Sequence, residues 1–553
     1  MQSTVGKRLL TTSANVEDGR DDARLARYTH PKRRRRSRSR TKTPSQKLYD
    51  KQLTALVMIL LVAAGATLYS AYFIFHAAAR RQHARPHDVD QHRLHAQVAI
   101  SIVATPTASV APTTVTRHSM PELAESNQRY LAYLPHSGYH NQRIALENAL
   151  VLARVLNRTL LLPPVRLGRP LTYKPFDVLY EASAITKVGL EYCSREVSHD
   201  QDPPPECDDY MDYTYVSWDT LVDMPSIRSE QPILDGWNFT DAWLHDVLNI
   251  SSAAGDIFYL KDATRKQYSF QDVFTLDPPA RKFSEYIHID MLARRPERLI
   301  QLGTLFGSAR LYLLLKANFL LRKHIRERMV FTNDHLIRAA SAIRVALGGT
   351  YLGAHLRVSG NIFEWSAPEN TRLAWWTLLH GALGFTDEEI LELEETFFPE
   401  EDALEPPVIP VDIPAMRSPH PPLPPLPVDA SPASGLSCRG PLHRASHLQQ
   451  LNIPLFIATD AHNPSANPVL WRFIRTFPCS FFLEDFKEHT RALGQLRSET
   501  DGVPLKRFLM PFLDAMVVGQ AWQVVGTEQS TFSAFVADVL WRTYHGFEIV
   551  QRG

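Results

Sequence analysis

Four short polar motifs in this 553-residue chain each follow an apolar run and carry side chains that could hold a phosphate or a sugar hydroxyl. They are Ser137–Arg143, His355–Arg357, Thr459–Asp460 and Gly526–Ser533. Backbone N–H groups at a helix start bind anions, and charged or amide side chains strengthen that binding. The residue types therefore indicate a site for a phosphorylated ligand. Taken singly, each motif also fits an ordinary helix cap or a buried ion pair.

The first motif lies between an apolar YLAYL and a helical pattern over residues 144–156, which TLLL follows. Gly138 permits a tight turn, while Asn141 and Gln142 offer side-chain donors. The order of strand, loop, helix and strand predicts a βαβ unit.

The second motif places His355 and Arg357 on one face of a strand, since side chains alternate along it. A fixed guanidinium charge suits a diphosphate that becomes a leaving group. Asp460 ends the expected strand 454–460, and the expected strand 523–526 enters a helix over 530–542. With a helix over 336–347, these segments predict a second α/β unit facing the first across a cleft.

Several classes of chemistry lack support in the sequence. It has no C-x-x-C, H-E-x-x-H, G-x-S-x-G, P-loop or G-x-G-x-x-G motif, and no D-x-D before the expected cleft. We therefore expect no metal and no dinucleotide cofactor. Four cysteines make no disulfide scaffold. Cys193 and Cys207 are close enough to pair, while Cys438 and Cys479 are less obvious partners.

Residues 53–75 contain no charge and are long enough to cross a bilayer of about 30 Å, which predicts one transmembrane helix rather than a buried core helix. Residues 33–52 hold nine Lys/Arg and residues 76–95 hold four, so the N-terminus should be cytoplasmic. The basic residues 1–52 then form a cytoplasmic tail that contacts lipid, in preference to a nucleic-acid patch.

The remaining chain should be lumenal. Residues 76–124 are expected to be a flexible stem. Residues 125–335 and 336–553 are expected to be two Rossmann-like domains, on the acceptor and donor sides. The insertion 399–434 holds 12 of the 39 prolines and is interpreted as a solvated loop rather than a polyproline ligand. Sequons at Asn157, Asn238 and Asn249 suit a lumenal domain, though helix and strand flank Asn157.

The ordered set of motifs is more specific than any member. YLAYLPHSGYHNQRIALENALVLARVLNRTLLLPP, YLGAHLRV, LFIATDAHNP and LDAMVVGQAWQVVGTEQSTFSAFV together resemble the GDP-fucose protein O-fucosyltransferase family, in a fungal-type branch. The resemblance covers roughly residues 128–546. It implies a GT-B architecture, with GDP-fucose between two Rossmann-like domains, and inverting, metal-independent transfer of fucose to a hydroxyl.

The resemblance also implies roles for individual residues. Near the diphosphate and acceptor it places Gly138, Asn141 and Gln142. The resemblance implies that Arg357 holds the β-phosphate and that the neighbouring His355 orients it. It also implies that Asp460 and Asp514 lie near the guanine. The phosphate loop would consist of Ser530, Thr531 and Phe532. The sequence departs from the family after Arg357, where Val358–Asn361 stands in place of an acidic turn.

The catalytic base stays open. His140 could take the acceptor proton, because the ordinary pKa of imidazole lies near the pH of the lumen. A dissociative transition state assisted by Arg357, with little help from a base, is the alternative.

The sequence therefore predicts a single-pass type II membrane glycosyltransferase of the Golgi or endoplasmic reticulum. Its partners would be GDP-fucose, a protein or glycan acceptor and the membrane, without nucleic acid. Two alternatives are a catalytically inactive GT-B-like membrane protein and a transferase that uses another GDP-sugar such as GDP-mannose. The acceptor and the oligomeric state are not specified.

Overall fold

The structure is a computed structural model. It describes residues 128–185, 187, 189–194, 204–275, 282–400, 405–410, 418–427, 431–433 and 435–550. The basic tail, the expected transmembrane helix at 53–75 and the expected stem at 76–124 lie outside these residues. Within the described ranges, no helix combines the length and apolarity needed to cross a membrane.

The first sheet has five parallel strands in the order β5-β2-β1-β9-β6. The strands are β1 (Tyr130–Ala132), β2 (Thr159–Leu162), β5 (Ile233–Asp235), β6 (Ile257–Leu260) and β9 (Leu299–Leu302). β1, β2 and β9 are buried along their whole length, which is expected of central strands in a parallel sheet. The helix α2 (Tyr139–Val155) connects β1 to β2, so the predicted βαβ unit is confirmed.

The second sheet has four parallel strands in the order β13-β12-β11-β14. The strands are β11 (Leu352–Leu356), β12 (Leu455–Thr459), β13 (Ser480–Phe481) and β14 (Gln523–Gly526). Three of the four were expected from the sequence at these places. A mixed α/β fold with parallel sheets is therefore confirmed, while the GT-B arrangement and the domain boundaries stay predictions.

Two smaller sheets were not expected. One is parallel, in the order β10-β7-β8, and the other is an antiparallel pair. The strands are β7 (Tyr268–Gln271), β8 (Glu285–His288), β10 (Leu311–Tyr312), β3 (Val165–Gly168) and β4 (Tyr213–Val216). Besides α2, the described α-helices of the first unit are α3 (Phe176–Ser183), α4 (Met224–Arg228), α5 (Asp241–Leu248), α6 (Ile289–Ala293) and α7 (Lys316–Arg328).

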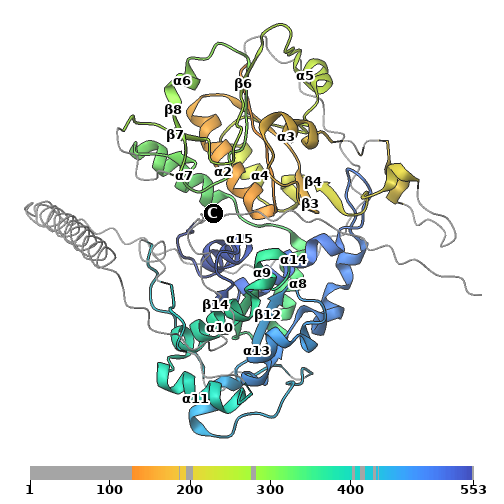
Figure 1. Cartoon of the computed structure of the whole chain (residues 1–553). Helices are drawn as coiled ribbons and strands as arrows, with labels where there is room; N and C mark the ends of the chain where they lie inside the picture. Colours follow the sequence, from red (N-terminus) through yellow and green to blue (C-terminus); the bar gives the residue numbers. More distant parts are fainter. Residues whose placement is uncertain are drawn as a thin grey trace, which may run out of the picture. The chain divides into compact units, whose positions relative to one another are not determined.

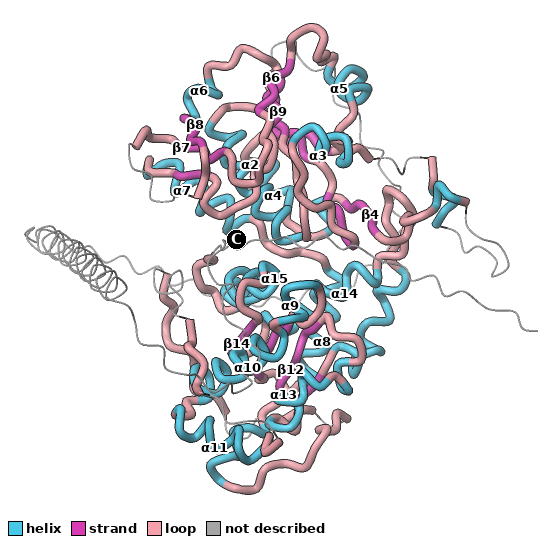
Figure 2. Tube along the Cα trace, in the orientation of Figure 1, coloured by secondary structure: helices cyan, strands magenta, loops and turns pink. Residues whose placement is uncertain are grey.

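Helices cover the second sheet, as the cyan segments around its magenta strands show (Figure 2). The described α-helices of this second unit are α8 (Asp334–Ala346), α9 (Asn361–Trp365), α10 (Ala367–Thr377), α11 (Asp387–Phe397), α13 (Trp471–Thr476), α14 (Lys506–Gly519), α15 (Thr531–Ala534) and α16 (Arg542–Tyr544). α14 packs against α8, β11 and β12 (Figure 1). This packing is close at Gly353 in β11, where an added Cβ would lie 2.9 Å from the Ala521 Cβ. A larger residue there would push the sheet away from its helix.

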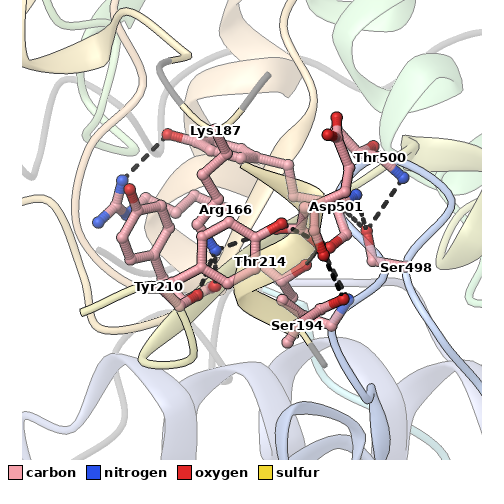
Figure 3. A network of polar contacts seen from close by, with 12 residues as sticks. Arg166, Lys187, Ser194, Tyr210, Thr214, Ser498, Thr500 and Asp501 are labelled. Carbon is pink, nitrogen blue, oxygen red and sulfur yellow. Dashed lines mark hydrogen bonds and ion pairs between the residues drawn. The ribbon is translucent and has the colours of Figure 1, made fainter. Parts of the chain in front are cut away.

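A buried ion pair joins segments that are far apart in the sequence (Figure 3). The Lys187 ammonium lies 3.0 Å from the Asp501 carboxylate, and both side chains are almost completely buried. Lys187 also donates to the carbonyl oxygens of Tyr210 and Tyr213. The Thr214 hydroxyl donates to the second Asp501 carboxylate oxygen at 2.8 Å. Both charges are thus paired and hydrogen-bonded, as a buried pair requires.

Both cysteine pairs form disulfides. Cys193 pairs with Cys207, as the sequence suggested, and Cys438 pairs with Cys479 across 41 residues. The second pair was less obvious because only the fold brings its members together, with Cα atoms 4.2 Å apart.

The described parts of the proline-rich insertion are more than a solvated loop. The Trp522 indole donates to the Pro424 carbonyl at 2.9 Å, and His420 stacks on Phe547 with ring centroids 4.7 Å apart. The Ala433 N–H donates to the Ala346 carbonyl at the end of α8. Parts of the insertion therefore pack onto the second α/β unit.

Candidate functional site

The carboxyl ends of β11, β12 and β14 meet at one edge of the second sheet, because the three strands are parallel neighbours. His355 and Arg357 lie at the end of β11, Asp460 directly follows β12, and Thr527 directly follows β14. The structure thus brings together three of the four predicted motifs. In parallel α/β sheets this edge is where ligands bind.

His355 is held in place by its neighbours. Its side chain is buried, its Nδ1 lies 2.7 Å from the Ser533 hydroxyl, and its ring lies 5.2 Å from that of Phe532. Burial and the nearby Arg357 charge lower the pKa of His355 to about 4. The imidazole is therefore neutral near pH 7 and can orient a ligand without adding charge.

Gly526 makes this contact possible. A Cβ at Gly526 would lie 2.7 Å from the Ser533 Cβ, so only glycine lets the end of β14 approach the helix that follows. The close approach brings the Ser533 hydroxyl within bonding distance of His355.

Arg357 is a partly exposed cation at this edge. Its backbone N–H donates to the Thr527 hydroxyl at 2.8 Å, which fixes where the side chain starts. The guanidinium carbon lies 4.4 Å from the Phe363 ring centroid, and the side chain is 41% exposed. Its Nε lies 4.0 Å from the nearer Asp460 carboxylate oxygen, which is too far for a hydrogen bond. A guanidinium that stacks on a ring and stays partly exposed can bind an anion such as a diphosphate.

Asp460 shapes the turn that follows Arg357. One carboxylate oxygen accepts hydrogen bonds from the N–H groups of Val358 (2.8 Å) and Ser359 (3.1 Å). The Ser359 hydroxyl donates to the Asp460 carbonyl at 3.1 Å. The turn Val358–Asn361 has no carboxylate of its own, and Asp460 after β12 supplies one to it.

The third part of the edge is the start of the helical run at α15. Ser530 caps it, accepting a hydrogen bond from the Ser533 N–H at 3.2 Å, and Gln529 before it has a positive φ of 64°. Thr531 and Phe532 are half-buried at this helix start. The run continues through a π-helical segment, Phe535–Trp541, into α16.

The first motif lies at the start of α2 in the first unit. Gly138 is the exposed N-cap with φ −71°, and a Cβ added there would meet nothing within 4 Å. The unusual backbone belongs to Ser137, with φ 65°. The tight turn expected at Gly138 is therefore made one residue earlier, by a residue type that seldom adopts this conformation.

Asn141 and Gln142 lie inside the protein rather than on its surface. The Gln142 amide donates to the carbonyl oxygens of Ser137 (3.1 Å) and Arg166 (2.8 Å), and its oxygen accepts from the Arg166 N–H. It ties α2 to β3. Asn141 is also buried, and its carboxamide oxygen has no hydrogen-bond partner among the described residues.

Aromatic rings connect the first motif to the edge of the second sheet. The buried His140 ring lies 5.3 Å from Phe535, Phe535 lies 5.8 Å from Phe532, and Phe532 lies 5.2 Å from His355. Tyr139 packs edge-on against Phe512 of α14 at 4.7 Å. The start of α2 thus contacts the helix that closes the second-sheet site, although the sequence places them almost 400 residues apart.

Asp514 lies on α14 rather than at the end of a strand. Burial raises the pKa of Asp514 well above the ordinary value. One of its carboxylate oxygens has no hydrogen-bond partner in the described part of the chain. The neutral, protonated form of the carboxyl group fits these surroundings, and the guanine role that the resemblance implied for Asp514 stays a prediction.

Three supporting residues were not among the predicted site residues. Thr527 accepts the Arg357 N–H, Ser533 contacts His355, and Phe363 carries the Arg357 guanidinium. The hydroxyls belong to the fourth motif and could have been selected from it. Nothing in the sequence predicted the role of Phe363 except its position six residues after Arg357.

No protein-family model matches this chain. A segment of 38 residues is 53% identical to O-fucosyltransferase 30 of Arabidopsis thaliana, which is 7% of this chain and 8% of that protein. Similar solved structures include POFUT1 in its apo form, with TM-score 0.32 and 12% identity over 78% of this chain and 100% of that chain. POFUT1 in complex with GDP-fucose has TM-score 0.27 and 10% identity over 74% and 99% of the two chains. Similarities this low carry no argument about function, and the curated match covers one short segment.

Proposed function

We propose that the protein transfers fucose from GDP-fucose to a hydroxyl of a protein or glycan. The observation that carries this proposal is the convergence of Arg357, His355 and the start of α15 at one edge of a parallel sheet. The segment that resembles O-fucosyltransferase 30 supports the choice of sugar and donor.

In this proposal Arg357 binds the diphosphate and stabilises the negative charge that develops on GDP as the bond to the sugar breaks. The backbone N–H groups at Thr531 and Phe532 add partial positive charge to the same side. Neutral His355 orients the group, and Asp460 keeps the turn after Arg357 in shape. The acceptor hydroxyl attacks from the opposite face of the sugar, so the configuration inverts, and its proton leaves to a base or to water.

His140 as that base stays a separate proposal. The structure buries the ring against Phe535, and an acceptor could reach it only if that contact opened. Unchanged turnover in a His140→Ala variant would exclude the base role.

We also propose that the protein is a type II membrane protein of the Golgi or endoplasmic reticulum, and that the reaction needs no metal or other cofactor. The uncharged residues 53–75 with their basic flank support the topology. Two disulfides in the described fold support an oxidising compartment. The fixed charge of Arg357 can stabilise GDP in the place where other transferases use a metal ion.

The test is calorimetric titration of the full chain in detergent with GDP, GDP-fucose and GDP-mannose, each with and without EDTA. We expect GDP-fucose to bind in EDTA and to release GDP slowly by transfer to water. Arg357→Ala should lower turnover by about a hundredfold, or about 2.7 kcal/mol of transition-state stabilisation. The matched control is Arg338→Ala, because this arginine is exposed on α8 and should leave turnover unchanged.

The other outcomes separate the alternatives. Binding of GDP-fucose without any release of GDP would favour an inactive, ligand-binding protein. Tighter binding of GDP-mannose than of GDP-fucose would change the proposed donor sugar but not the proposed binding site. Normal turnover in Arg357→Ala would refute the assignment.

A further inference from the structure

A second polar network lies at the carboxyl edge of the first sheet. β1, β9 and β6 are neighbours there, and the chain that leaves each strand carries one side chain of the network. These are His136 after β1, Thr304 after β9 and Asp262 after β6. All three residues are buried, with 2–4% of their surface exposed. The proposed reaction uses none of them.

Hydrogen bonds connect the three residues in a row. The His136 Nε2 lies 2.8 Å from the Thr304 hydroxyl oxygen, and the Thr304 N–H donates to the Asp262 carboxylate at 3.0 Å. The carboxylate packs directly on Gly303, where an added Cβ would lie 2.1 Å from its other oxygen. The glycine before Thr304 therefore lets the carboxylate approach the chain that it holds.

The other end of the row is Ser137. The His136 Nδ1 lies 2.7 Å from the Ser137 hydroxyl oxygen. Ser137 is the residue with φ 65°, a conformation that costs a non-glycine residue on the order of 1 kcal/mol. Its N–H donates to the Leu171 carbonyl at 2.6 Å, so contacts on both sides hold the strained residue. Gly138, the exposed N-cap of α2, comes next.

His136 can serve as a bridge because its ring is neutral. Burial lowers the pKa of His136 to about 3, and the charges of Arg265 and Arg310 act in the same direction. A neutral imidazole has one N–H donor and one acceptor nitrogen, and a hydroxyl lies at each. Since a hydroxyl can donate or accept, both contacts are satisfied in either tautomer.

We propose that His136 is a positioning residue, braced by Thr304 and Asp262. It holds the segment Ser137–Asn141, which comprises the loop before α2 and the first residues of that helix, in the shape needed to bind the donor diphosphate. The inference rests on the proposed function, because ring contacts from His140 through Phe535 to Phe532 join the start of α2 to the edge where that function places the donor. The proposal predicts that a substitution at Thr304, which is two hydrogen bonds away from Ser137, weakens donor binding although Thr304 does not contact the donor.

The experiment compares Thr304→Val with Thr304→Ser in the full chain. Valine keeps the shape of threonine and removes the hydroxyl, whereas serine keeps the hydroxyl. Hydrogen exchange of the loop amides is measured by mass spectrometry, and the Kd for GDP-fucose is measured by calorimetry. We expect Thr304→Val to speed exchange over residues 137–143 about tenfold and to raise Kd at least fivefold. Thr304→Ser should stay within twofold of the wild type in both measurements.

Each result decides one part of the proposal. Exchange in Thr304→Val at the wild-type rate, or equal losses in both variants, would overturn the anchoring role. Faster exchange with an unchanged Kd would overturn the link to the donor. If the wild type binds no GDP-fucose, the proposed function fails, and the exchange measurement still decides whether the network holds the loop. His136→Asn provides a second variant, since its amide can reach Ser137 but not Thr304, and it should behave as Thr304→Val does.

Discussion

The buried pair of Lys187 and Asp501 allows a prediction that does not depend on the function. Asp501→Asn keeps the size of the side chain and an acceptor for the Thr214 hydroxyl, but it removes the negative charge. Lys187 would then keep only the carbonyl oxygens of Tyr210 and Tyr213 as partners. Its surroundings already lower the pKa of Lys187, chiefly through burial, and Asp501 opposes that effect.

The expected loss follows from this geometry. Removing one member of a buried pair costs about 3–5 kcal/mol, because the other charge is left without compensation. An exposed pair of similar length is the matched control. Lys261 and Asp177 are 2.6 Å apart with side chains more than half exposed, so Asp177→Asn should cost less than about 1 kcal/mol.

The assay is thermal and urea unfolding of the full chain in detergent, with each variant measured alone and Lys187→Met combined with Asp501→Asn. The double variant should lose clearly less stability than the sum of the two single variants, since no lone charge is left buried. Additive losses, within about 0.5 kcal/mol, would show that the two side chains do not stabilise each other and would refute the reasoning.

Three further predictions concern stability and the site. His355 has a folded pKa of about 4 against about 6.5 unfolded, so the unfolded state binds more protons between these values and stability falls by up to about 3 kcal/mol as the pH drops from 6.5 to 4. His355→Asn should flatten that part of the unfolding curve, and an unchanged slope would contradict the assignment. Gly526→Ala should force Ser533 away and weaken GDP binding in calorimetry, while wild-type affinity would show that the close approach is not needed. Replacing Cys438 and Cys479 by serine should cost about 2–5 kcal/mol in urea unfolding, and a loss below 1 kcal/mol would show that the fold holds that loop without the bond.

The strands and helices could be predicted where short-range pattern decides them. The βαβ unit around α2 and the strands β11, β12 and β14 follow from apolar runs bounded by turn residues. β3 and β4 were missed because 44 residues separate them, and nothing in either segment indicates the other. The small sheet with β7 and β8 lies beside charged and exposed positions, which weaken the apolar pattern on which such a prediction depends.

The sequence predicted which residues lie together at the candidate site, but it did not predict which groups each of them contacts. Parallel strands must end at one edge, so the sequence could place His355, Arg357 and Asp460 together. It could not show that Ser137, rather than Gly138, takes the left-handed backbone, because local residue preference favours the glycine. Contacts with distant segments hold Ser137: His136 beside it reaches Thr304 after β9, and the Ser137 N–H donates to the Leu171 carbonyl. Long-range contacts of this kind leave no mark on the local sequence.

Some polar residues of the predicted motifs stabilise the backbone, and others are available to bind a ligand. The Gln142 amide is hydrogen-bonded to backbone groups, and the Asp460 carboxylate accepts two backbone N–H groups. The hydrogen bonds of both side chains therefore stabilise the backbone conformation. Arg357 forms no hydrogen bond to Asp460 and exposes much of its side chain. Asp460→Asn, which keeps the acceptor oxygen, should therefore leave donor affinity within a few-fold of the wild type, whereas Asp460→Ala should release the turn and weaken binding about tenfold. Equal losses in both variants would mean that the Asp460 charge itself acts on the ligand, and the guanine role that the family resemblance implies would then be the better explanation.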